Sequence, residues 1–225
     1  MQNRNKSDAD STDRFVCLLE QRGCQFWDED HLDEVLTVRG KRPDFYVRTK
    51  EKLDFLVEVE SFARESFSRR ALRQNQVMFG LAERDWRQIR HAAKRAANQL
   101  RPYQSLKIPM LIVLDDLTMG IPKNVAHLRF ALLGHPELHL QINTQGRSVG
   151  SQALHHGSGQ FFNEREKRYV SAVAWNLQTH LRIVHNPWAI VRLPTGTFTK
   201  SVDEHWGYND EGDWVKFEIN AANRG

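Results

Sequence analysis

Three carboxylates follow one another closely in the first third of the chain. Asp44 stands at the start of an apolar run, thirteen residues intervene, and a second apolar run ends with Glu58 and Glu60. Oxygen-rich sets of this kind suit hard divalent cations such as Mg²⁺. A cation held there would polarise a phosphate and lower the pKa of a bound water, so the spacing is typical of sites that hydrolyse phosphodiester bonds.

Two strands are expected to position these side chains. Apolar residues alternate along 53–60, so Glu58 and Glu60 project from one face of a strand. The run 45–47 is aromatic and β-branched, and five polar residues without Pro or Gly connect the two runs, which predicts a hairpin. Antiparallel pairing folds Asp44 back toward Glu58. We therefore expect three carboxylates to converge, with their repulsion relieved by a bound cation.

Pro43, Asp44, Glu58 and Glu60 resemble the motif of the PD-(D/E)XK nuclease superfamily, in an E-x-E variant with Glu60 where the family has Lys. The resemblance implies that Asp44, Glu58 and the backbone carbonyl of Val59 bind Mg²⁺ or Mn²⁺. Glu60 would be a general base or a further ligand, because a carboxylate cannot supply the positive charge of Lys. A structural explanation stays open, since solvated strands often alternate apolar and acidic residues and Pro-Asp is a common turn signal.

A basic segment follows the carboxylates. Residues 64–101 contain ten Lys or Arg and three Asp or Glu, a net charge of +7, whereas the whole chain carries +4. Such a concentration favours phosphate binding, and a solvated helix face is the alternative. The predicted nucleic-acid-binding residues are Arg87, Arg90, Lys94, Arg95, Gln99 and Arg101. Gln99 and Tyr103 also resemble the QxxxY element of the superfamily, with Pro102 placing Tyr103 beyond the helix end.

The order of elements predicts an α/β fold. The continuously apolar run 108–114 is typical of a central strand, which gives the order strand, strand, helix, strand with a parallel crossover. This order resembles the restriction-endonuclease-like core, a mixed central sheet flanked by helices, here with extra C-terminal strands near 171–175 and 181–185. Superfamily members often bring an acid from the first helix to the metal, which here implies Glu20. Asp115 and Asp116 are either ligands or caps of the following turn.

Composition sets broader limits. With 225 residues, 40% hydrophobic and 27% charged, the chain can bury one good core. We predict a disordered polar tail over 1–11 and a single domain over 12–225, with a core at about 12–120 and a C-terminal elaboration at about 121–225. No window is apolar enough to span a bilayer, and the spacing of Cys17 and Cys24 matches no zinc or redox motif, so we expect a cytoplasmic protein.

The sequence therefore predicts a nuclease that uses Mg²⁺ or Mn²⁺ to cut DNA, with RNA as the alternative substrate, in defence or repair. Two other functions remain open. One is a catalytically inactive relative that binds nucleic acid. The other is an interaction module whose basic face binds an acidic partner. The sequence also leaves open a homodimer.

Overall fold

The computed structural model describes residues 6–37, 40–62, 83–116, 125–134, 136–139, 153–156, 160–177, 179–197 and 203–218. Its helical elements are α1 (Lys6–Gln21), η1 (Leu32–Glu34), α3 (Glu83–Leu100), η2 (Arg101–Leu106) and α4 (Val125–Leu133). Its strands are β1 (Gln25–Asp28), β2 (Phe45–Arg48), β3 (Asp54–Phe62), β4 (Met110–Asp116), β5 (Pro136–His139), β6 (Ala153–His156), β7 (Ala172–Asn176), β8 (Leu181–His185), β9 (Glu204–Tyr208) and β10 (Trp214–Phe217).

Eight of these strands form one sheet in the order β1-β2-β3-β4-β7-β8-β9-β10, and β5 pairs with β6 in a separate hairpin. The sheet is mixed, because β3, β4 and β7 run parallel to one another and β8 runs parallel to β9, while the other neighbours are antiparallel. The predicted α/β class with a mixed sheet is confirmed. The extra C-terminal strands are also present, and they continue the same sheet.

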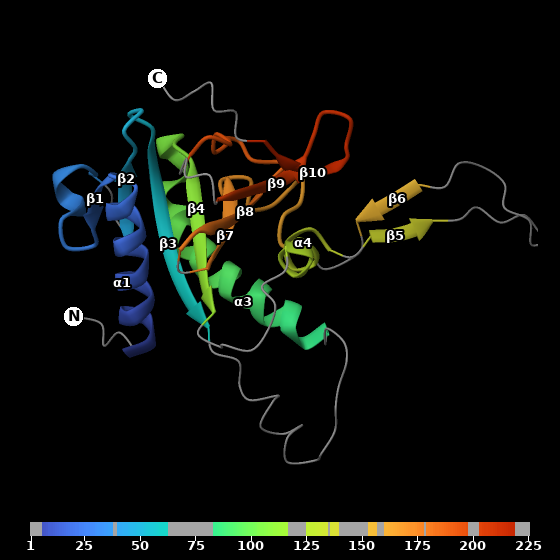
Figure 1. Ribbon diagram of the computed structural model, residues 1–225, viewed down its shortest axis with the longest axis horizontal. Coiled ribbons are helices and arrows are strands. Elements are labelled where there is room, and N and C mark those ends of the chain that lie inside the picture. Colours follow the sequence, from blue (N-terminus) through green and yellow to red (C-terminus); the bar gives the residue numbers. More distant parts are fainter. Residues whose placement is uncertain are drawn as a thin grey trace, which may run out of the picture.

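Different helices cover the two faces of the sheet (Figure 1). On one face, α1 packs through Phe15, Leu18 and Leu19 on strand side chains that include Phe45 and Val57. On the other face, α3 and α4 cover a second core. The strand residues of that second core include Leu56, Ile112, Leu114, Val173 and Val184. Because successive strand residues face opposite sides, the even-numbered positions of β3 from Leu56 onward point toward α3.

Among the described residues, the elements from β2 to β4 follow the predicted order of strand, strand, helix, strand. β2 and β3 form an antiparallel hairpin with Phe45 opposite Val57, and residues 49–53 connect them. Arg48 Nε donates to Asp54 Oδ1 at 2.6 Å where the hairpin turns. α3 leads from β3 to β4, which runs parallel to β3 and is buried from residue 110 to 115. The predicted hairpin and central strand are therefore confirmed.

The N-terminal helix begins within the predicted disordered tail. We expected a polar tail over 1–11, but α1 begins at Lys6, so residues 6–11 are helical. A polar composition does not prevent a helix where one side of it packs on protein. Ser11 is buried and accepts a hydrogen bond from Arg14 Nη2 at 3.1 Å. Residues 64–82 of the predicted basic segment lie outside the described residues.

A buried ion pair joins α1 to the C-terminal strands. Arg22 follows the end of α1, and its guanidinium contacts both carboxylate oxygens of Asp203, with Nη2 to Oδ1 at 2.8 Å. Asp203 Oδ1 also accepts the backbone N–H of Leu181, the first residue of β8, at 2.8 Å. Within the described residues, no helix is both long and apolar enough to cross a membrane.

Candidate functional site

Asp44 and Glu58 lie side by side where β2 begins. Phe45 pairs with Val57, so Asp44 falls opposite Glu58 one position further along the antiparallel ladder. Two hydrogen bonds fix this arrangement. The Val59 N–H donates to Asp44 Oδ2 at 2.8 Å, and the Asp44 N–H donates to Glu58 Oε2 at 3.3 Å. The structure therefore brings the first two predicted carboxylates together.

The backbone of Val59 faces the same place. The N–H and C=O of one strand residue point to the same side of the strand, as the paired bonds of an antiparallel ladder require. Because the Val59 N–H reaches Asp44, the Val59 carbonyl also points to the side of β3 on which β2 lies. The carbonyl that the resemblance implies as a ligand thus points toward the two carboxylates.

α3 runs antiparallel to β3 and contacts both glutamates. Gln99 Nε2 donates to Glu58 Oε1, and Arg95 Nε donates to Glu60 Oε1 at 2.7 Å. The spacing matches across the interface, because two residues of a strand and four residues of a helix each advance by roughly 6 to 7 Å. Arg95 and Gln99, one helical turn apart on α3, therefore each lie opposite one glutamate of β3.

Burial differs between the two glutamates. Glu58 is only 2% exposed, whereas the side chains of Glu60 and Arg95 are 16% and 58% exposed. Tyr103 closes the buried end, where its hydroxyl donates to the Lys41 carbonyl at 2.7 Å. Burial raises the pKa of Tyr103 above its ordinary value, and the charge of Glu58 raises it further while nearby Arg42 lowers it.

The predicted set is brought together only in part. Asp44, Glu58 and the Val59 backbone meet, and Gln99 joins them, whereas Glu60 is engaged by Arg95. Among the described residues, no group of three or more His, Cys, Asp or Glu side chains could hold a metal ion. The expected convergence of three carboxylates is therefore corrected to a pair with a third acid beside it, turned toward α3.

Glu20 lies elsewhere. It belongs to α1, which covers the face of the sheet opposite to Glu58. Its carbonyl accepts the Gly23 N–H at 2.9 Å, just before Gln25 pairs with Arg48 at the far end of β2. That end is roughly 10 Å along the strand from the end that Asp44 precedes. The structure does not bring Glu20 to the carboxylate pair.

Asp115 has a structural partner on the α1 side. Arg14 Nε donates to Asp115 Oδ2 at 2.9 Å, and Asp115 is 2% exposed. The acid thus anchors α1 to the end of β4. The sequence left open a metal ligand or a turn cap for Asp115, and this ion pair with Arg14 is neither. The side chain of Asp116 lies outside the described residues.

The predicted nucleic-acid-binding residues divide between two flanks of α3. Each helix residue turns by about 100°, so Arg95 and Gln99 lie within about 40° of each other, while Arg101 lies about 200° from Gln99. The first flank faces the glutamates of β3. The other four predicted residues lie on the second flank, three of them in α3 and the last at the start of η2, which follows α3 directly: Arg87, Arg90, Lys94 and Arg101.

The role of Arg95 beside Glu60 was missed at the level of sequence. Arg95 was expected to contact only nucleic acid, and the signal that would have paired it is the match between two spacings. Arg95 and Gln99 are four apart on a helix, and Glu60 and Glu58 are two apart on a strand.

No model of a known protein family matches this chain, and comparison with the curated proteins and with the solved structures found no match.

Proposed function

We propose that this protein is a metal-dependent nuclease with a restriction-endonuclease-like core, and that it hydrolyses phosphodiester bonds of DNA. The observation that carries the proposal is the pairing of Asp44 with Glu58 beside the Val59 backbone. The resemblance of these residues to the PD-(D/E)XK motif supports it. The β2-β3-α3-β4 unit supports it as well, because that unit delivers the pair to an edge flanked by α3.

The donor atoms fit a small hard cation. Mg²⁺ in proteins is commonly held by one or two carboxylates and keeps its other positions for water and phosphate oxygens. Asp44 and Glu58 would supply the carboxylates and Val59 a carbonyl, so a cluster of three acids is not required. Bound there, Mg²⁺ or Mn²⁺ would offset charge on the phosphate and lower the pKa of a water molecule.

The neighbouring side chains have separate tasks in this proposal. Gln99 donates to Glu58 and so holds the carboxylate in one orientation without cancelling its charge. Glu60 would orient or deprotonate the attacking water. Arg95 is more than half exposed, and exposed ion pairs contribute about 0 to 1 kcal/mol, so its release from Glu60 to hold a phosphate costs little.

Isosteric variants test the proposal. Asp44→Asn and Glu58→Gln should each reduce Mg²⁺-dependent cleavage of plasmid DNA by about 10³-fold, since a metal site supplies several kcal/mol of charge stabilisation. Glu211→Gln, an exposed acid in the turn between β9 and β10, is the matched control and should cleave at the wild-type rate. Equal cleavage by all three variants would overturn the proposal. The same assay on RNA decides between the two substrates.

A second function is favoured by one observation, the engagement of Glu60 by Arg95. If that ion pair keeps Glu60 from activating water, the protein binds nucleic acid without cutting it. In that case, titration calorimetry of the wild type would show DNA binding without uptake of Mg²⁺, and no cleavage would be found with either cation.

A further inference from the structure

A cleft of about 600 Å³ lies along the second flank of α3, the flank that faces away from Glu58. One wall consists of residues from α3 and η2: Lys94, Asn98, Arg101 and Gln104. The other wall is formed by residues 165–169, with Ile190 beside them. Two segments far apart in sequence thus enclose one concave surface.

Positive charge dominates this cleft. It is lined by five cationic side chains and one carboxylate: Lys94, Arg101, Arg165, Lys167, Arg168 and Glu166. The carboxylate is matched by its neighbour, because Lys167 Nζ lies 3.0 Å from Glu166 Oε2. Within the described part of the chain, no ion pair involves Lys94, Arg101 or Arg165. An excess of cations over carboxylates on a concave surface attracts polyanions.

The wall formed by residues 165–169 is held in place by its backbone. Ile190 N–H donates to the Arg168 carbonyl at 2.7 Å, and Asn186 Nδ2 donates to the Val170 carbonyl at 2.8 Å. Asn186 is 2% exposed, so this brace is buried. Tyr169 joins the wall to α3, because its hydroxyl donates to the Ala97 carbonyl at 3.0 Å. The cations are therefore presented by a preorganised surface.

We propose that this cleft binds the phosphodiester backbone of a nucleic acid strand at a distance from the carboxylate pair. The proposal deepens the proposed nuclease function and rests on it for the identity of the ligand. The Lys and Arg side chains would contact phosphate oxygens. Phosphate groups are the same at every nucleotide, so these contacts would not select a sequence.

The position of the cleft sets the spacing between the two contacts. The cleft and the carboxylates lie on opposite flanks of α3, and a helix with its side chains is roughly 10 to 12 Å across. A backbone held in the cleft is therefore separated from the carboxylate pair by more than the roughly 3.4 Å that a strand advances per phosphate, so the cleft contacts phosphates other than the scissile one.

The experiment measures binding without cleavage. A fluorescent DNA duplex is titrated with protein in EDTA at several salt concentrations, and the slope of log K against log salt is determined. The variant Lys94→Ala/Arg101→Ala/Arg165→Ala should lower the magnitude of the slope by roughly 2 to 3, since each phosphate contact contributes about 0.9. Because no metal is present, this result stands or falls independently of any cleavage activity.

A matched variant controls for net charge. Lys50→Ala/Lys52→Ala/Arg192→Ala removes the same charge from exposed positions outside the cleft and should leave the slope near the wild-type value. Equal slopes for the two triple variants would overturn the proposal. Poly-glutamate serves as a competitor, and its displacement of DNA at equal charge concentration would also overturn it by identifying an acidic protein as the ligand.

Discussion

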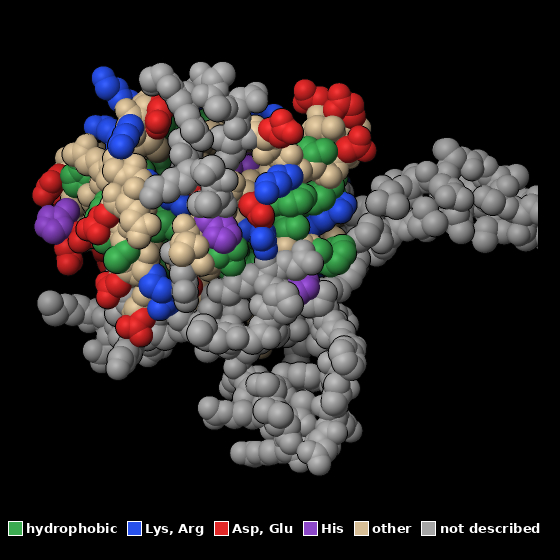
Figure 2. All heavy atoms as spheres, in the orientation of Figure 1, with side chains coloured by type: hydrophobic (Ala, Val, Ile, Leu, Met, Phe, Trp, Pro, Cys, Tyr) green, Lys and Arg blue, Asp and Glu red, His purple; other side chains and the backbone are tan. Residues whose placement is uncertain are grey.

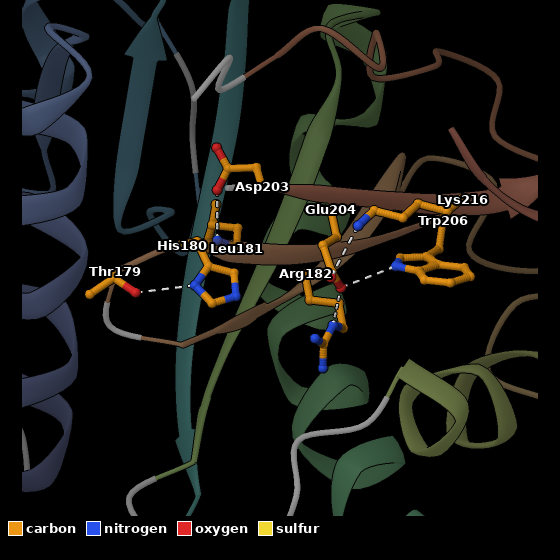
Figure 3. Close-up of polar contacts among 8 residues, drawn as sticks. All are labelled: Thr179, His180, Leu181, Arg182, Asp203, Glu204, Trp206 and Lys216. Carbon is orange, nitrogen blue, oxygen red and sulfur yellow. Dashed lines mark hydrogen bonds and ion pairs between the residues drawn. The ribbon is translucent and has the colours of Figure 1, made fainter. Parts of the chain in front are cut away.

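Two clusters on the same face of the sheet, one around Glu58 of β3 and one around Glu204 of β9, surround their acids with different neighbours. Figure 2 shows cationic, acidic and hydrophobic side chains intermixed over the strands near the C-terminus. There, Glu204 of β9 receives Lys216 Nζ at 3.2 Å, Trp206 Nε1 at 3.3 Å and Arg182 Nε (Figure 3). At the other cluster, Glu58 accepts hydrogen bonds from a neutral amide and a backbone N–H.

The two acids differ in the charge of the donors that contact them at Glu204 and at Glu58. Burial alone raises the pKa of Glu204, but the hydrogen bonds from Arg182, Trp206 and Lys216 outweigh it and lower that pKa to about 2. Two cations thus match one carboxylate. At Glu58, the Gln99 amide and the Asp44 N–H hold the carboxylate next to Asp44, and a divalent cation bound there would relieve the repulsion between the two acids.

Addition of Mg²⁺ should separate the two clusters most strongly. At a concentration one hundred times the dissociation constant, a ligand that binds only the folded state raises the free energy of unfolding by about 2.7 kcal/mol. Glu58→Gln should abolish this gain, and Glu204→Gln should retain it. Urea unfolding with and without Mg²⁺ measures the effect, and an equal gain in both variants would remove the distinction between the clusters.

The C-terminal strands also hold two buried histidines, His185 and His205, whose pKa values are lowered so that both are neutral near pH 7. His185 Nε2 and His205 Nδ1 lie 2.9 Å apart. Burial lowers the pKa of His185 to about 3, with repulsion from His205 and Arg192 adding to it. Burial also lowers the pKa of His205 to about 4; a backbone hydrogen bond at Thr197 opposes this shift, and Arg22 contributes to it.

These shifts predict an acid-sensitive fold. An unfolded His has a pKa near 6.5, so below that pH the unfolded chain takes up protons that the folded chain excludes. The free energy of unfolding should be greatest above about pH 6.5 and fall as the pH decreases toward 4, by about 1.4 kcal/mol per pH unit for each His. His185→Gln should remove about one such contribution between pH 6 and pH 5. Parallel stability curves for variant and wild type would contradict this.

Loss of the Glu204 charge should have an effect of similar size, confined to stability. Glu204→Gln should lower the free energy of unfolding at pH 7 by about 1 to 2 kcal/mol, as expected when hydrogen bonds to a charged group are weakened. Because the folded pKa is depressed, this contribution is complete above the unfolded pKa near 4.3 and disappears as the pH falls through about 2. Denaturant unfolding of wild type and Glu204→Gln at pH 7 and at pH 3 measures the stabilisation and how much of it is lost in acid. Glu211→Gln is the control and should not change the free energy of unfolding.

The local parts of the candidate site could be predicted from the sequence. The alternation over 53–60 places Glu58 and Glu60 on one face, and the short connection before it predicts the hairpin that returns Asp44 to Glu58. Both depend on the period of a strand and the length of a loop, which are properties of neighbouring residues.

The remaining parts depend on how distant elements are oriented. The contact of Arg95 with Glu60 requires a particular rotation and direction of α3 against β3, which the helical period does not specify. The placement of Glu20 depends on which face α1 covers, and that follows from the burial of Phe15 and Leu19 against β2 and β3. A helix pattern gives the residues that are buried but not the sheet face that buries them.

The smallest predicted effect tests whether Arg95 closes its cluster as Arg182 closes the other. Arg95 is 58% exposed and Arg182 is 19% exposed. A solvent-screened pair contributes little, so Arg95→Gln should change the free energy of unfolding by less than about 0.5 kcal/mol, whereas Arg182→Gln should cost about 1 kcal/mol or more. Removal of the Arg95 charge should also tighten Mg²⁺ binding by about threefold, because a cation near the site is lost. Thermal unfolding of both variants and Mg²⁺ titrations give these values. If Arg95→Gln destabilised the fold as much as Arg182→Gln, the β3 cluster would be a structural ion pair like that of Glu204, and Glu60 would have no part in catalysis.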